Sequence, residues 1–293
     1  MGQRLLNENF IRQRSHELQI PYENLLAASV LEEIVRKIME SEAAACFWIK
    51  NHAKLNMECY RKNVALQLHF FMKESEQIHY KKGDVSSLFA VILRNYKKEA
   101  IHWNYRVWMD GRWICIHITG EIANVKVPIS VRLEPLLQEK LVPYQKEIRL
   151  FTNNNQKVCL FCYPSENIIV EKFLEVLEKL ELLNELSCYL ELYEMLKKES
   201  LSGRKVWELC MEGCRERRIP VERERFALWQ SYQTNRYMEQ KWKAYLKREK
   251  RDHPQWKDVM ELIIRFFSVI WDYMCRNVVY LGDWMPELER YIE

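Results

Sequence analysis

The sequence predicts an α+β fold, with a mixed sheet and helices in the N-terminal half and a helical C-terminal half. Segments with strand-like patterns dominate up to about residue 160, and from Ser165 the apolar spacing becomes helical. The chain has 293 residues, 48% of them hydrophobic and 29% charged, which is enough to bury a sizeable core. We therefore expect an α/β domain over residues 1–160 and a helical domain over residues 161–293.

Four elements are expected before residue 100. Residues 22–41 place apolar side chains at three- and four-residue intervals, which marks the buried face of a helix, and Pro21 is a common helix start. Residues 45–50 and 64–72 are short, apolar and aromatic, as buried strands are. Residues 86–97 are expected to form a helix that leads to the next part of the sheet.

The dipeptide Asp110-Gly111 indicates a β-hairpin between residues 102–109 and 112–119, because it readily adopts the positive backbone dihedrals of a two-residue turn. Residues 125–133 then alternate apolar and polar side chains, the pattern of a strand with one buried face. Pro128 has no backbone N–H to donate, so we expect this strand at a sheet edge or at a bulge.

The second half is expected to be helical after one more strand over residues 157–163. That strand contains Cys159 and Cys162, and residues three apart on a strand point to opposite faces, so core packing is favoured over zinc or redox chemistry. The nine cysteines of the chain are an odd number and fit reduced thiols. The expected helices are residues 165–182, 185–198, 204–218, 237–250 and 255–276.

The charge of the chain is unevenly distributed. The net charge is only +4, but residues 204–251 contain 14 Lys or Arg and 7 Asp or Glu. Five arginines there precede an aromatic-rich segment, and such a surface can bind RNA by holding phosphates and stacking bases. The alternative, which the helical spacing favours, is that the aromatics fill the core and the charges are solvated. The arginines are Arg215, Arg217, Arg218, Arg223 and Arg225.

Features of membrane insertion and secretion are not found in the sequence. No apolar run approaches the roughly 20 residues that span a bilayer, and residues 1–14 are polar and charged rather than built like a signal peptide. We expect a cytoplasmic protein without a membrane partner. His69, His102, Cys115 and His117 lie on predicted strands, but their spacing does not force a metal cluster, and we expect satisfied sheet residues.

Six segments, taken in order, carry a resemblance to a known family. In order and in apolar pattern they are similar to the AbiEii-type nucleotidyltransferases, the toxin components of abortive-infection and toxin–antitoxin systems. The likeness spans roughly residues 15–275, and Glu171-Lys172 and the region of Trp242 are kept as motifs. The segments are Phe47-Trp48-Ile49-Lys50-Asn51-His52, Asn63-Val64-Ala65-Leu66-Gln67-Leu68, residues 127–133, Val170-Glu171-Lys172-Phe173, Leu186-Ser187-Cys188-Tyr189-Leu190 and residues 241–246.

The resemblance implies that the metal-binding residues of the family have been replaced here. Members hold two magnesium ions with carboxylates, which stabilise charge on the attacking and leaving oxygens. The matching positions are Ala65, Gln67 and Arg132, with Ser187 near the aspartates of a later helix and Asn51-His52 at a glycine pair. Magnesium prefers anionic oxygen ligands. We therefore expect no catalytic residue, no metal and no cofactor.

What the resemblance leaves is a binding role. Lys172 matches a lysine that faces the nucleotide, and it is expected to keep a phosphate contact together with Lys50 and Arg132, unless it is an exposed helix lysine paired with a carboxylate such as Glu175. The expected partner is a protein, such as an antitoxin-like neighbour, or RNA through residues 204–251, in phage defence or toxin–antitoxin biology.

Two other hypotheses remain open. In the first, the protein is an active nucleotidyltransferase toxin that uses a non-standard carboxylate set, with Mg²⁺ and a nucleoside triphosphate as cofactors. The carboxylates nearest to the altered motifs are Glu58, Glu134 and Glu139. In the second, the protein is an assembly subunit whose exposed apolar surface binds a genome neighbour.

Overall fold

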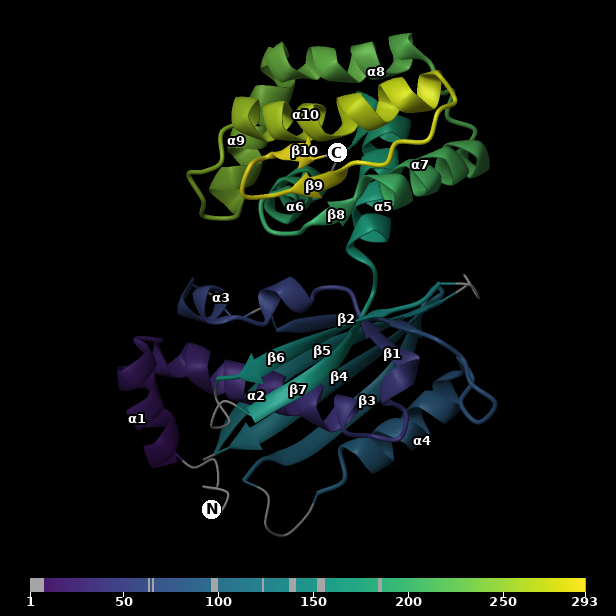
Figure 1. The fold of residues 1–293 in the computed structure, drawn as a ribbon. Helices are drawn as coiled ribbons and strands as arrows, with labels where there is room; N and C mark the ends of the chain where they lie inside the picture. The colour runs from purple at the N-terminus through teal and green to yellow at the C-terminus, as the bar shows by residue number, and fades with distance from the viewer. Residues whose placement is uncertain are drawn as a thin grey trace. The chain divides into compact units, whose positions relative to one another are not determined.

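A computed structural model describes residues 8–62, 64, 66–95, 100–122, 124–136, 141–151, 156–183 and 186–292 (Figure 1). The chain divides into two compact units, Met1–Tyr163 and Pro164–Glu293. The first unit contains a mixed sheet covered by helices, and the second is mainly helical. The predicted α+β class is confirmed.

The sheet of the first unit has seven strands in the order β3-β4-β5-β2-β1-β7-β6. β2 pairs parallel to β5, and β1 pairs parallel to β7, while the other neighbours are antiparallel. β2 and β5 are therefore neighbours near the centre of the sheet although their first residues, Gln67 and Val125, are 58 positions apart in the sequence. The strands are β1 (Phe47–Ile49), β2 (Gln67–Met72), β3 (His102–Asp110), β4 (Trp113–Ile122), β5 (Val125–Pro135), β6 (Tyr144–Leu150) and β7 (Gln156–Cys162).

The predicted hairpin joins β3 and β4. Asp110 and Trp113 are cross-strand partners on either side of the turn, and Gly111 has a φ of 58°. A residue without a Cβ adopts this conformation at no steric cost, which explains glycine at this position.

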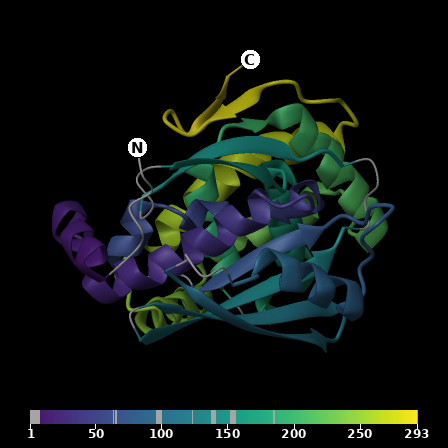
Figure 2. The same cartoon turned by 90° about the horizontal axis from the view of Figure 1, so that it is seen from below.

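The described helices of the first unit include two that cover one face of the sheet (Figures 1 and 2). α2 contacts β5 and β7, and α4 contacts β3. α2 comes so close to the sheet that a Cβ added to Gly120 on β4 would lie 2.6 Å from Cγ1 of Val30. The core of the unit forms between these helices and the sheet. The helices are α1 (Glu8–Leu18), α2 (Tyr22–Met39), α3 (Met57–Lys62) and α4 (Lys82–Ile92), with the 3₁₀ turns η1 (Ala44–Cys46) and η2 (His52–Lys54).

The expectation that Pro128 marks an edge strand is wrong for β5 as a whole. β5 lies between β4 and β2. Its pairing with β2 begins at Ser130, opposite Gln67, and the Ser130 N–H donates to the carbonyl of Leu66. Pro128, two residues earlier, lies before this pairing begins, so its missing N–H removes no bond from the described ladder.

The second unit packs its helices around an aromatic core. Phe173 on α5 stacks on Phe267 of α10 with ring centroids 3.5 Å apart, and Trp229 and Trp271 meet the Phe173 ring edge-on. The helices are α5 (Ser165–Lys179), α6 (Ser187–Leu196), α7 (Gly203–Arg217), α8 (Arg223–Gln230), α9 (Arg236–Arg248) and α10 (Trp256–Cys275), with η3 (Leu180–Leu182) and η4 (Ser231–Thr234). None of the described helices has the length and apolar character needed to cross a bilayer.

A small three-stranded sheet also belongs to the second unit. Its order is β10-β9-β8, formed by β8 (Leu201–Ser202), β9 (Asp283–Met285) and β10 (Arg290–Ile292). The sequence patterns did not indicate these strands. The indole N–H of Trp284 on β9 donates to the carbonyl of Leu196 at 2.8 Å, which ties the small sheet to the end of α6.

Candidate functional site

The face of the first sheet opposite its core carries several of the residues that the sequence singles out. Successive side chains of a strand point to opposite faces. On β2, Leu68 and Phe70 are buried in the core, whereas Gln67 is exposed and His69 is half-buried. On β5, Val131 is buried and its neighbour Arg132 is half-buried. We call the set Lys50, Gln67, His69, Ser130 and Arg132 the polar face.

Three basic side chains of the polar face lie in one row across neighbouring strands. Arg132 and His69 are direct partners in the parallel pairing of β5 with β2. The backbone N–H of Lys50, just after β1, donates to the carbonyl of His69 at 2.8 Å. The structure thus brings Lys50 and Arg132, which are 82 positions apart in the sequence, to either side of His69.

Aromatic rings support the two cations of this row. The guanidinium carbon of Arg132 lies 4.4 Å from the centroid of the Trp113 ring on β4. The ammonium of Lys50 lies 4.8 Å from the centroid of Phe71, and the Phe71 ring stacks on Tyr163 with centroids 4.1 Å apart. A cation over a ring face is attracted by the ring quadrupole, so these contacts hold the two side chains against their neighbouring rings.

Asn51 extends the pairing of β1 with β2 through its side chain. Its amide donates to the carbonyl of Gln67 at 2.9 Å, and its amide oxygen accepts the N–H of His69 at 3.0 Å. The φ of Asn51 is −110°, which needs no glycine. The side chain of Asn51 therefore holds the end of β1 against β2.

His52 does not belong to the polar face. Its side chain is buried, and its Nε2 lies 3.0 Å from the hydroxyl of Tyr144 on β6. The two rings meet edge to face with centroids 5.8 Å apart. His52 therefore anchors the segment after β1 to β6.

The remaining predicted positions are outside the described residues or belong to the second unit. Ala65 lies outside the described residues, and Ser187 is the first residue of α6 in the second unit. Lys172 on α5 is half-buried and forms an ion pair with Glu191 on α6. The expectation of pairing with Glu175 is wrong, because Glu175 instead pairs with Lys179 one helical turn later at 2.7 Å.

The carboxylates of the active-enzyme hypothesis are not gathered by the described fold. Glu134 lies on β5 opposite Phe71, and Glu58 on α3 forms an ion pair with Lys62 at 3.1 Å. Glu139 falls outside the described residues. Among the residues that the structure does describe, no group of three or more His, Cys, Asp or Glu side chains is placed to hold a metal ion, and this includes the histidines of the sheet.

The basic stretch of the second unit has its aromatic residues in the core. Trp229, Tyr232, Trp242 and Tyr245 are each at most 9% exposed, so their faces are not available to a base, and Tyr237 is the exception at 58%. Three of the arginines have partners. Arg217 pairs with Glu178 at 3.3 Å, Arg223 pairs with Asp272 at 3.3 Å, and Arg225 donates to the carbonyl of Leu177.

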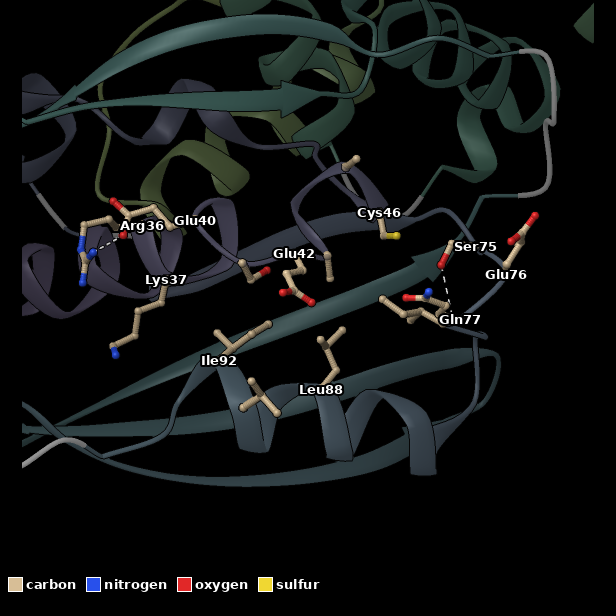
Figure 3. Close-up of a pocket in the computed structure, with 15 residues that line it drawn as sticks. Arg36, Lys37, Glu40, Glu42, Cys46, Ser75, Glu76, Gln77, Leu88 and Ile92 are labelled. Atoms are coloured by element: carbon tan, nitrogen blue, oxygen red, sulfur yellow. Dashed lines mark hydrogen bonds and ion pairs between the residues drawn. The ribbon is translucent and has the colours of Figure 1, made fainter.

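A separate hollow of about 950 Å³ lies between the end of α2 and α4 in the first unit (Figure 3). Apolar side chains including Leu88 and Ile92 face it from α4, and charged side chains including Lys37 and Glu42 face it from α2 and the turn that follows. None of the polar-face residues is among its lining residues. The helix-covered hollow and the polar face are therefore different places on this unit.

The nine cysteines form no disulfide in the described structure. Cys159 is exposed on β7, and Cys162 is buried on the same strand, as expected for residues on opposite faces. Burial raises the pKa of Cys188 and that of Cys214 to about 12. Thiols held protonated in this way are poor nucleophiles, so they are core residues.

Comparisons with known proteins identify structural likeness only. No family model matches the chain, and no curated protein matches its sequence. The solved structure of JHP933 from Helicobacter pylori is 8% identical, with a TM-score of 0.49 over 88% of this chain and 96% of that one. A second H. pylori protein, provisionally described as a nucleotidyltransferase, is 10% identical, with a TM-score of 0.47 over 88% of this chain and 99% of that one.

Three residues of this region are not among the predicted site positions: His69 and Ser130 of the polar face, and Trp113, whose ring contacts Arg132. His69 was considered only as part of a metal cluster, although it continues the alternation from Gln67 on the same strand face. Trp113 was assigned only to a hairpin strand. The alternation along β2 could have placed His69 beside Gln67. The contact of Trp113 with Arg132 depends on the register between β4 and β5, which one sequence alone does not reveal.

Proposed function

We propose that the protein is a catalytically inactive relative of the AbiEii-type nucleotidyltransferases and acts by binding a protein or RNA partner in phage defence or toxin–antitoxin biology. The resemblance assigns the metal-binding carboxylates of the family to positions 65, 67 and 132. The observation that carries the proposal is the pairing of Arg132 with His69, next to Lys50, on the polar face.

The chemistry of this row opposes two-metal catalysis. Two divalent ions need several carboxylate oxygens in the positions where the polar face has an amide and basic side chains. Arg132 and Lys50 place positive charge there, which disfavours a metal ion and favours an anion. The guanidinium of Arg132 can donate two parallel hydrogen bonds to a phosphate or a carboxylate. The polar face is thus suited to hold an anionic group without a metal.

A transfer assay tests the absence of catalysis. Purified protein is incubated with each of the four α-³²P-labelled nucleoside triphosphates, with Mg²⁺ or Mn²⁺, and with total RNA or protein as acceptor. We expect no label in any acceptor above the level of a heated sample. Labelling that disappears in Glu134→Gln but persists in the exposed control Glu147→Gln would replace this proposal with the active-enzyme hypothesis.

A capture experiment tests the binding role. The tagged protein is isolated from its own host with and without ribonuclease, and bound protein and RNA are identified separately. We expect a partner that the wild type retains and that Lys50→Glu with Arg132→Glu loses. A double charge reversal at Lys81 and Lys82, which are exposed at the start of α4, is the matched control. If both double variants retain the partner equally, the polar face is not the binding site.

A further inference from the structure

The last turn of α9 and the loop after it form a folded-back unit in the second half of the chain. Lys250 adopts a positive φ of 54°, and its N–H donates to the carbonyl of Lys247 at 3.2 Å. The next N–H, that of Arg251, donates to the carbonyl of Leu246 at 2.9 Å. A left-handed residue followed by such a bond ends a helix and turns the chain back over its final turn.

Two side-chain hydrogen bonds hold the loop that follows α9. The indole N–H of Trp242, a residue 1% exposed, donates to the carbonyl of Pro254 at 2.8 Å. The side-chain amide of Gln255 donates to the carbonyl of Asp252 at 3.1 Å. Between α9 and the loop lies a hollow of about 460 Å³, lined by Lys243, Leu246, Lys247, Lys250, Arg251, Asp252 and Gln255.

Four of the seven lining residues are cations, and one is a carboxylate. Lys243 pairs with Glu239 at 2.6 Å, and Arg251 pairs with Glu194 at 2.7 Å. Lys247 and Lys250 are exposed, and neither forms an ion pair with any residue in the described ranges. The hollow therefore keeps an excess of positive charge that the described protein does not neutralise.

We propose that this hollow, which we call the α9 pocket, binds phosphates of a single-stranded RNA backbone. Lysine ammonium groups bind phosphate as point charges. Lys243 and Lys247 lie one helical turn apart on the same side of α9, and Lys250 and Arg251 line the same hollow from the folded-back end, so four cations face one space that can hold more than one phosphate. The backbone of a single strand is a chain of phosphates.

The composition of the α9 pocket favours RNA over a protein partner and over a membrane surface. Its one apolar lining residue, Leu246, is 5% exposed. Contacts between proteins are depleted in lysine and have an apolar centre, and an amphipathic helix that lies in a membrane surface inserts exposed apolar side chains into the lipid, which the α9 pocket lacks. Attraction of lysines to anionic lipid by charge alone is tested by the vesicle competition below. The inference concerns a different place from the polar face and stands even if the protein transfers nucleotides.

Fluorescence anisotropy with the full chain tests the proposal. The probe is a fluorescein-labelled 15-nucleotide oligouridine, titrated at several potassium chloride concentrations. We expect Lys247→Glu with Lys250→Glu to weaken binding about tenfold or more and to reduce the slope of log affinity against log salt by about 1.4, the loss of two phosphate contacts. Asp252→Asn removes the one carboxylate and is expected to tighten binding.

Controls separate a local site from general charge. Lys81→Glu with Lys82→Glu makes the same change of net charge in the first unit and is expected to leave the affinity within about twofold. Thermal unfolding confirms that each variant is folded. Equal loss in both double variants, no loss in the α9 double variant, or stronger competition by polyglutamate or by vesicles of anionic lipid than by unlabelled oligouridine would each overturn the proposal. Competition by inorganic phosphate at the same total phosphate concentration would overturn the assignment to an RNA chain.

Discussion

Arg132 lies directly opposite His69 in the parallel pairing of β5 with β2, and its guanidinium rests on the ring of Trp113. This arrangement fixes a cation on the exposed side of the two central strands. In a two-metal site the same neighbouring strands would have to present carboxylates toward one point. The described side chains at this pairing are instead a guanidinium and an imidazole.

Carboxylates introduced at the three positions that the family resemblance assigns to metal ligands should create a metal site. We expect Ala65→Asp with Gln67→Asp and Arg132→Asp to bind Mn²⁺ at millimolar concentrations or below, because the change removes the cation and adds three anionic oxygen donors. Electron paramagnetic resonance of free Mn²⁺ measures the binding. The same three positions changed to Asn are the control, and a triple aspartate variant that binds no more Mn²⁺ than this control would show that the positions do not converge.

Gly203 should be intolerant of any side chain. It is the first residue of α7, its N–H donates to the carbonyl of Gly282 at 3.1 Å, and an added Cβ would lie 2.0 Å from that same oxygen. Because the contact is with backbone, relief requires β9 to shift. We expect Gly203→Ala to lower the free energy of unfolding by about 2 kcal/mol or more, measured by urea denaturation.

Gly83 provides the matched control for that substitution. It lies in the first turn of α4, and an added Cβ would meet nothing within 4 Å. Gly83→Ala should therefore be neutral or stabilise the protein by about 0.5 kcal/mol, because alanine loses less backbone entropy in a helix. Equal destabilisation by both substitutions would contradict the close approach of Gly203 to Gly282.

The spacing of apolar residues along the sequence was sufficient to predict helices and strands that pack one face against the core. β5 alternates apolar and polar residues, and the expected helix over residues 255–276 corresponds to α10. β6 is one of the two edge strands and has only one buried residue, Leu150, so its apolar signal is weak, and α3 and α8 are too short for a periodic signal. The wrong expectation for Pro128 came from treating a strand as uniform, whereas the partner of β5 begins only at Ser130.

The sequence predicted which residues of one strand lie on the polar face. It did not predict which residues of neighbouring strands lie next to each other there. The alternation on β2 and β5 placed Gln67 and Arg132 away from the core. The neighbour of Arg132 is His69 because of the register between two strands far apart in the sequence. In the same way, the partner of Lys172 is Glu191 on the next helix, which a search for charges one turn away on α5 does not find.

Alkylation should follow burial of the thiols. Cys159 is exposed, whereas Cys188, Cys210 and Cys214 are buried, and burial raises the pKa of each of these three thiols. Since the thiolate is the reactive form, iodoacetamide at pH 8 should modify Cys159 first and these three at least a hundredfold more slowly. Peptide mass spectrometry against time measures the order. Labelling of Cys210 at the rate of Cys159 in the folded protein would contradict the packing of α7.

The same thiols should make the protein less stable in alkali. The pKa of Cys188 and that of Cys214 are raised from 9.0 to about 12 in the folded state, because burial disfavours the thiolate. The unfolded chain therefore loses these protons first, so their contribution to stability is present below about pH 9 and is lost progressively between pH 9 and 12. We expect the urea midpoint to fall over this range, and Cys188→Ala with Cys214→Ala should flatten the fall. If the urea midpoint of that variant falls with pH as steeply as that of the wild type, the two buried thiols are not the cause of the loss of stability.

Lys172 should behave as a structural residue. Its ammonium is half-buried and paired with Glu191, which is 43% exposed, so the pair joins α5 to α6 within the second unit but remains partly solvated. We expect a coupling free energy of about 0.5–1 kcal/mol in a double-mutant cycle of Lys172→Met and Glu191→Gln, measured by urea denaturation. If Lys172 instead contacts a nucleotide phosphate, Lys172→Met should weaken binding of a fluorescent ATP analogue about tenfold while Glu191→Gln leaves it unchanged or strengthens it. Loss of nucleotide binding in the first variant without coupling in the cycle would return Lys172 to the role that the family resemblance implies.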